Sequence, residues 1–339
     1  MPRTMTMPRT PAALRLVPET ETAAPALRLL LFVGGRFGDD EAGREAARAI
    51  HGGFERLHGD RAPMASLNLA GSGAGRVKRA GKATLDKVAS FFDLKVASYG
   101  QAVRRYGPVR VEADEPWLPF FAIEQWSDGF HIEIAVPPEG THARPLTELV
   151  EANLADLDPL CGAIGYGFWF PPRLSSLVAY IGHRAEKWPA AMAFTAQVGT
   201  SVVFEPRSPG GELARWWEGP AGLADVGWKT IVGRSFADRL PDLSTLPYGV
   251  TVERTGHATT ITAGPRPIWG WAAQGEPDAD GPDGEAALAR MAAVARVLAP
   301  LRARDREAAR ANFRSCARQE DEVPACRAYF DRLDRWAAD

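Results

Sequence analysis

The chain has 339 residues, of which 45% are apolar and 24% charged, and 40 Lys and Arg against 42 Asp and Glu give a formal net charge of -2. This composition is typical of a globular protein with a sizeable core, and it excludes a collagen-like, membrane-spanning or wholly disordered chain. The balanced charge leaves no basic excess with which the whole molecule would hold nucleic acid phosphates.

Residues 1–25 have the composition of a disordered leader. Met-Pro-Arg-Thr occurs twice within residues 1–10, and proline, threonine and charged residues dominate up to Pro25. Such a segment cannot bury enough apolar surface to offset the entropy lost on ordering. The apolar run at residues 27–33 is too short to span a bilayer and has no signal-peptide cleavage site after it, so we expect a cytoplasmic protein.

Beyond the leader, the apolar periodicity switches between the two-residue repeat of strands and the longer repeat of helices. Asp39 and Asp40 can cap the first helix, and Pro300 should kink or break the last strongly periodic one. The expected elements are a strand at 27–33, helices ending near Leu57 and covering 85–92, a hairpin at 120–136, helices after Pro145 and at 172–181, a strand at 228–232, a hairpin at 250–262 turning near Gly256, and helices at 288–301 and 324–336.

Two details of this pattern concern which side chains are buried. Leu85 is expected on the apolar stripe of its helix, and His131 alternates with apolar residues, which places it on the solvent face of its strand. Strands and helices mix without strict βαβ alternation. The sequence therefore predicts an α+β fold with mixed, largely antiparallel sheets, packed helices and a C-terminal helical segment.

No catalytic, phosphate-binding or metal motif is complete. The glycines at residues 71–75 fail the spacing of dinucleotide and P-loop motifs, and Ser235 lacks the closing glycine of a nucleophile elbow, so we expect it to cap a short helix instead. The acidic residues of the polar loop at 274–284 lack the ligand spacing of a calcium loop, which favours a solvated loop. The histidines lack metal-ligand spacing and are expected to be surface polar residues; they are His51, His58, His131, His142, His183 and His257.

The three cysteines do not form a disulfide framework. Cys161 is expected to be a buried structural thiol. Cys316 and Cys326 flank a turn and could approach each other, but in a cytoplasmic chain they would stay reduced. We therefore expect no catalytic residue, no cofactor and no metal.

Three stretches in this order, residues 161–170, 227–233 and 260–270, resemble the type VI immunity family. The first contains a Gly-Tyr-Gly-Phe segment, the second a Gly-Trp strand ending in glycine, and the third an Ala-Gly segment with a later Pro and Gly. The motif residues are expected to be structural, since glycines beside aromatic rings permit close backbone approach. They are Gly165, Tyr166, Gly167, Phe168, Gly227, Trp228, Gly264, Pro267 and Gly270.

The resemblance covers residues 26–302, either as one domain or as lobes at 26–145 and 146–302, and leaves 303–339 as a helical extension. It implies a non-enzymatic protein that binds and neutralises an antibacterial toxin, often one delivered by a type VI secretion system. The alternatives are an enzyme with a cleft near Cys161, His183 or His257, and a scaffold or regulatory module. Exposed aromatic and charged residues suit an interface, and the candidates are Arg215, Trp216, Trp217, Glu218, Trp269, Trp271, Asp278, Asp280 and Asp283.

Overall fold

The computed structural model describes residues 24–69, 75–110, 115–126, 128–138, 143–169, 188–192, 196, 203, 222–223, 225–271, 280–302 and 331–336. The strands of the main sheet are β1 (Ala24–Gly34), β2 (Met64–Asn68), β3 (Lys78–Arg79), β4 (Ala102–Tyr106), β7 (Phe120–Gln125), β8 (Gly129–Val136), β9 (Pro159–Trp169), β10 (Lys229–Val232), β11 (Val250–Thr255) and β12 (Ala258–Ala263). They lie in the order β11-β12-β10-β9-β1-β8-β7-β4-β2-β3, and each neighbouring pair is antiparallel.

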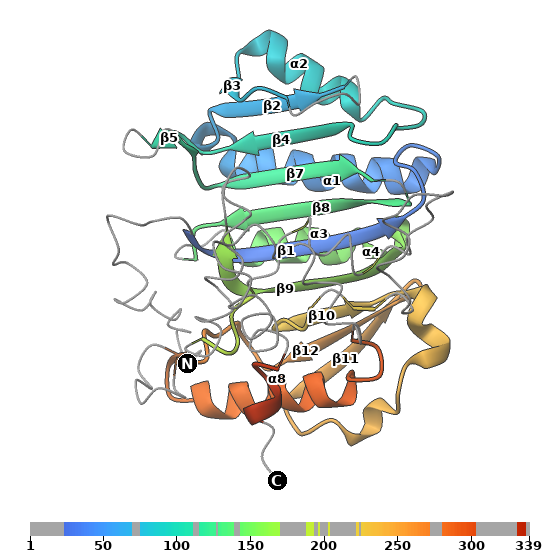
Figure 1. The fold of residues 1–339 in the computed structure, drawn as a ribbon, viewed down its shortest axis with the longest axis vertical. Helices are drawn as coiled ribbons and strands as arrows, with labels where there is room; N and C mark the ends of the chain where they lie inside the picture. The colour runs from blue at the N-terminus through green and yellow to red at the C-terminus, as the bar shows by residue number, and fades with distance from the viewer. Residues whose placement is uncertain are drawn as a thin grey trace, which may run out of the picture.

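Helices cover this sheet, which makes the fold α+β as the sequence predicted (Figure 1). In the view of Figure 1, α1, α3 and α4 lie behind the strands, while α2 and α8 lie at opposite ends of the sheet. A separate two-stranded ribbon joins β5 (Val109–Arg110) to β6 (Glu115–Pro116). The helix bounds are α1 (Glu41–His58), α2 (Lys82–Phe91), α3 (Ala143–Ala152), α4 (Leu154–Leu157) and α8 (Gly284–Val297).

The first helix follows the sequence prediction closely. The Asp40 carboxylate accepts hydrogen bonds from the backbone N–H groups of Ala42 and Gly43, at 3.3 and 2.8 Å, so it satisfies two of the donors left free at the helix start. Ile50 and Phe54 are fully buried on the face that packs into the main core. No described helix combines the length and the apolar character needed to cross a bilayer.

Both predicted hairpins are present. β7 and β8 pair from Phe120 with Ala135 to Gln125 with Phe130, and β11 and β12 turn at Gly256, whose φ of 59° suits glycine. α8 ends at Val297, three residues before Pro300, which cannot continue a helix.

Two local predictions are wrong. Leu85 of α2 is 38% exposed, because α2 lies at the end of the sheet and buries Thr84, Val88 and Phe91 instead. The short 3-10 helix at Arg234–Arg239 begins after Gly233, and no side chain caps it, so Ser235 is not its N-cap. The helices expected at 172–181 and in most of 324–336 lie outside the described residues, and the described end of the latter, Asp334–Trp336, is a 3-10 helix.

The central strands are buried on both faces, which corrects the prediction for the histidines. All eight residues of β8 are buried, and His131 is 3% exposed. His51 and His58 of α1 are also buried. One-sided alternation along β8 predicted a solvent face, but the second face of the strand is covered as well. Of the described histidines, only His257 at the β11–β12 turn is exposed.

Candidate functional site

Three aromatic residues of the glycine motifs, Tyr166, Phe168 and Trp269, form a buried core with two further tryptophans between β9 and the segment that follows β12. Tyr166 stacks on Trp269 with ring centroids 5.0 Å apart, and Phe168 lies against Trp188 at 5.3 Å. Trp188 in turn stacks on Trp271 at 5.6 Å. All five side chains are buried. These three motif rings therefore stabilise the fold from inside and present little surface to a partner.

The motif glycines allow backbone segments to approach these rings. A Cβ at Gly167 would lie 2.1 Å from the carbonyl oxygen of Met192, and a Cβ at Gly227 would lie 2.6 Å from a carbonyl oxygen of β9. Met192 pairs there with the edge of β9, since its N–H donates to the Tyr166 carbonyl at 2.8 Å and its carbonyl accepts from the Phe168 N–H at 2.9 Å. Any larger side chain at Gly167 would break this pairing.

The loop after β12 is held by one buried carboxylate. The backbone N–H groups of Trp269 and Trp271 donate to the two carboxylate oxygens of Asp280, at 2.7 and 2.5 Å, and Asp280 is fully buried. Arg266 donates to the Asp280 carbonyl. The prediction of a solvated loop is therefore wrong for Asp280, whose charge is satisfied by backbone donors in the core.

These positions decide what the predicted interface residues can do. Trp269, Trp271 and Asp280 are buried, so they offer a partner no exposed surface, and the interface interpretation of these three is corrected to a structural one. Asp283 is exposed at the start of α8, where its side chain makes no capping hydrogen bond. Arg215, Trp216, Trp217, Glu218 and Asp278 lie outside the described residues, as do Cys316, Cys326, His142 and His183.

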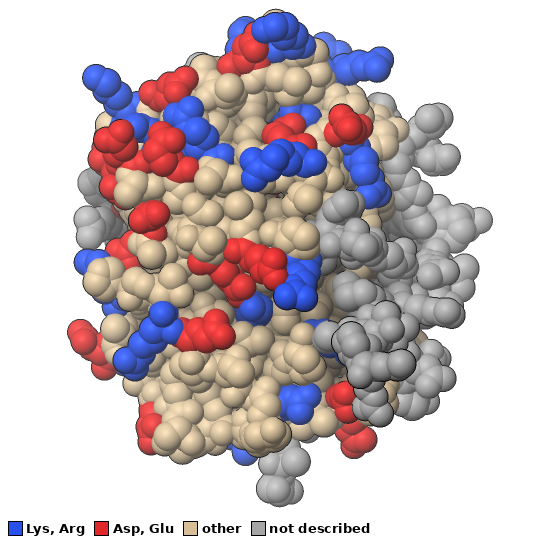
Figure 2. All heavy atoms as spheres, turned by 180° about the vertical axis from the view of Figure 1, so that it is seen from behind, with Lys and Arg blue, Asp and Glu red and all other residues tan. Residues whose placement is uncertain are grey.

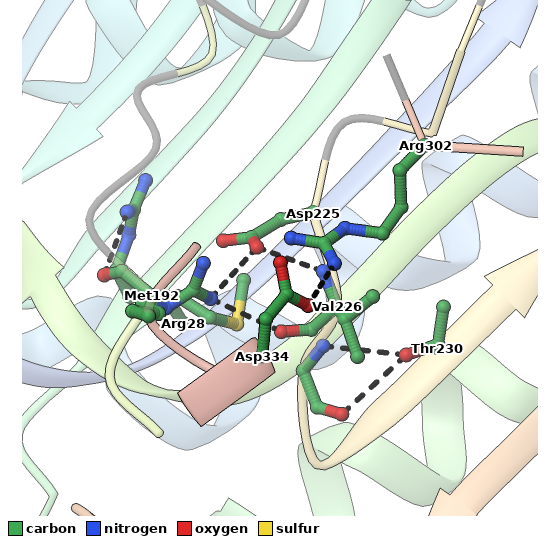
Figure 3. A network of polar contacts seen from close by, with 9 residues as sticks. Arg28, Met192, Asp225, Val226, Thr230, Arg302 and Asp334 are labelled. Atoms are coloured by element: carbon green, nitrogen blue, oxygen red, sulfur yellow. Dashed lines mark hydrogen bonds and ion pairs between the residues drawn. The ribbon is translucent and has the colours of Figure 1, made fainter. Parts of the chain in front are cut away.

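A buried arginine anchors the middle of the sheet. Arg28 of β1 is 1% exposed and forms an ion pair with Glu133 of β8 at 2.6 Å. Its guanidinium also donates to the Met192 carbonyl at 3.3 Å (Figure 3). Arg28 thus links two central strands to the segment beside β9. Because its charge is neutralised by Glu133, it is a structural cation and not a free anion-binding group.

A second group of ion pairs ties residues 331–336 to the segment just before β10 (Figure 3). Arg332 donates to the Asp225 carboxylate at 2.7 Å and to the Val226 carbonyl at 3.2 Å. Arg302 and Asp334 pair at 2.7 Å beside it. Arg332 and Asp225 have side-chain exposures of 1% and 6%. The residues just before the C-terminus are therefore an integral part of the domain.

His131 lies in a polar cluster on the face of the sheet opposite α1. Its Nδ1 accepts a hydrogen bond from the Trp126 indole N–H at 2.8 Å, and Arg104 and Glu124 pair nearby at 2.5 Å. Burial, with a smaller contribution from the Arg104 charge, lowers the pKa of His131 to about 3. A histidine that is neutral and this weakly basic is poorly matched to general base catalysis at neutral pH.

The alternative of an enzyme is based on Cys161, His183 and His257. Within the described residues, these form no common site. Cys161 is buried in β9, where it lies opposite Phe32 and Val232, as expected for a structural thiol. His257 is exposed at the β11–β12 turn, and His183 lies outside the described residues. Within the described part of the chain, no group of three or more His, Cys, Asp or Glu side chains could hold a metal ion.

The two edges of the sheet differ in their surfaces. β11 has four consecutive exposed residues, 251–254, and Tyr248 just before it is fully exposed. At the opposite edge, β3 has two residues, and α2 lies beside it. Figure 2 shows basic and acidic side chains mixed toward the α2 end of this face and fewer charges at the α8 end. The exposed charged residues around β3 and α2 include Asp86 and Asp93 and six basic residues, Arg76, Lys78, Arg79, Lys82, Lys87 and Lys95.

Comparison with known proteins supports the fold. No family model matches the chain, and no curated protein matches it. Among solved structures, the T6SS protein PA0821 of Pseudomonas aeruginosa is similar with a TM-score of 0.62 and 16% sequence identity, over 83% of this chain and 74% of that chain. At this identity the likeness establishes a shared fold.

Proposed function

We propose that this chain is an immunity protein that binds a toxin delivered by a type VI secretion system and neutralises it by covering the toxin's active site. The observation that carries the proposal is the fold shared with a type VI secretion system protein across 83% of the chain. The order of the three glycine-aromatic stretches, which resembles that of the type VI immunity family, supports it independently. In this proposal the protein acts in the cytoplasm as a stoichiometric inhibitor, without a cofactor.

The distribution of the motif residues supports a binding role. Tyr166, Phe168 and Trp269 are buried against one another, and Gly167 is required by the close approach of Met192. A scaffold that is fixed from inside leaves its loops and edges free to differ between relatives, which is where recognition residues concentrate. Each immunity protein of such a group could thus keep one fold while matching its own toxin.

The charged groups of the core also fit a binder better than an enzyme. Arg28 and Arg332 are paired with carboxylates, and the pKa of His131 is held at about 3 by burial. Catalytic acids and bases work best with pKa values near the working pH. These groups instead fix strands and termini in place.

Co-expression tests the proposal. The chain is produced together with the toxin encoded by the gene adjacent to its own, in cells that the toxin alone kills, and the complex is isolated through a tag on the toxin. We expect restored growth and co-purification of the two proteins. A folded chain that neither binds that toxin nor protects the cells would overturn the proposal.

A further inference from the structure

The backbone of β11 offers hydrogen-bonding groups that the described fold leaves unused. β11 is an edge strand that pairs with β12, with Thr255 opposite Ala258 across a two-residue turn. In an antiparallel ladder, alternate residues direct their N–H and C=O groups to one neighbour, so residues 255, 253 and 251 bond to β12. The backbone groups of Val252 and Arg254 therefore point away from the sheet, toward the open edge.

The side chains leave this edge accessible. Val252 is 41% exposed, and the residues on either side of it are exposed too, so neither face of the strand is covered at its centre. At the start of the strand, the N–H of Val250 is used by a turn hydrogen bond to the Pro247 carbonyl at 3.1 Å. The open segment thus extends from Thr251 to Arg254.

We propose that β11 is a self-association surface, on which a second copy of this chain adds its own β11 antiparallel to the first. The two sheets would then be joined edge to edge and related by a two-fold axis perpendicular to the sheet. The N–H and C=O groups of one β11 would pair with the same groups of the other. The outward groups of Val252 and Arg254 restrict the pairing to registers centred on Val252, Glu253 or Arg254.

Charge selects between these registers. Centred on Val252, the pairing places Val252 opposite Val252 of the second copy, Thr251 opposite its Glu253, and Val250 opposite its Arg254. Centred on Glu253, it places two carboxylates directly opposite each other, and centred on Arg254 it places two guanidinium groups opposite each other; both are unfavourable. In the first register the two valines also extend an apolar row, because each lies beside the buried Ile261 of its own β12.

The opposite edge of the sheet does not fit a second copy. β3 consists of Lys78 and Arg79, both exposed, so pairing with itself would bring basic side chains together over only two residues. Short edge strands with lysine and arginine are a known means of preventing edge-to-edge association. β11 has neither of these protections along residues 251 and 252.

The test measures the mass of the full chain in solution, without toxin, by light scattering over a concentration series. We expect a dimer, and we expect Val252→Lys to weaken dimerisation by about tenfold or more, because two ammonium groups would meet at the symmetry axis. Val96→Lys is the matched control, since Val96 is 42% exposed outside β11, and it should leave the dimer intact. A chain that is monomeric throughout, or a dimer unaffected by Val252→Lys, would overturn the proposal.

Disulfide trapping tests the register without destabilising a fold. Opposed residues in a hydrogen-bonded antiparallel pair have Cα atoms about 5.5 Å apart, within the range of a disulfide. Under mild oxidation, Val252→Cys should give a covalent dimer well above the background of the unsubstituted chain, and Glu253→Cys should not. The reverse pattern would reject the register centred on Val252. Because no toxin is present, these results are independent of the proposed immunity function.

Discussion

The motif core beside β9 and the β11 edge lie in the same sheet, with β12 and β10 between them, and their physical character is opposite. Around β9, the rings of Tyr166 and Trp269 are stacked and buried, and Asp280 is bonded to backbone donors. Along β11, Val252 and its neighbours are open to solvent. The buried rings and glycines that carry the resemblance therefore maintain the fold, and the exposed backbone of the sheet lies elsewhere, along β11.

The largest effect should come from emptying the motif core. Trp269→Ala removes a fully buried ring from its stack with Tyr166, and we expect the free energy of unfolding to fall by about 3–5 kcal/mol. Chemical denaturation with urea measures this loss. Tyr248→Ala, at a fully exposed position beside β11, is the control and should change stability by less than about 0.5 kcal/mol. Equal losses at both positions would contradict the distinction between core and edge.

A smaller loss is expected when the carboxylate that holds the loop is removed. Asp280→Ala leaves the N–H groups of Trp269 and Trp271 without their acceptor, which should cost about 2–4 kcal/mol in total. Asp283→Ala provides the comparison, because its exposed side chain makes no capping hydrogen bond. If the two variants unfolded at the same denaturant concentration, Asp280 would not be the anchor of this loop.

The buried histidine should make stability depend on pH. The pKa of His131 is about 3 when folded and near the usual 6.5 when unfolded, so the unfolded chain binds the proton first as the pH falls. The contribution of His131 to the free energy of unfolding is complete above pH 6.5. As the pH falls from 6.5 to 3, this contribution is lost by about 1.4 kcal/mol per pH unit. His131→Gln should flatten the pH dependence of the unfolding free energy in this window. An unchanged slope for the His131 variant would refute this.

The smallest effect on folding is expected at the edge. Val252→Lys should shift the unfolding free energy of the dilute monomer by less than about 0.5 kcal/mol, because the side chain replaced is already partly in water. Thermal unfolding at low protein concentration measures this. A large loss would show that β11 contributes to the core in a way that its exposure does not reveal.

Local patterns in the sequence were enough to predict the elements that depend on neighbouring residues. The Asp40 cap of α1, the β7–β8 hairpin and the turn at Gly256 each follow from a few consecutive residues, and the structure confirms them. Cys161 is buried, as predicted from the sequence.

What the sequence could not predict depends on residues far apart in the chain. Arg28 meets Glu133 across 105 positions, and Arg332 meets Asp225 across 107. The burial of His131 depends on the second face of β8 being covered, which the alternation along one strand does not encode. The same holds for the exposure of β11, because a strand becomes an edge only through the order in which distant strands pair.

The most direct test of the account is the titration of the purified chain against the toxin encoded beside its gene, with toxin activity as the readout. We expect toxin activity to fall linearly with added chain and to be abolished at a fixed molar ratio, because binding is tight and stoichiometric. Toxin activity that is unchanged in the presence of excess folded chain would contradict it.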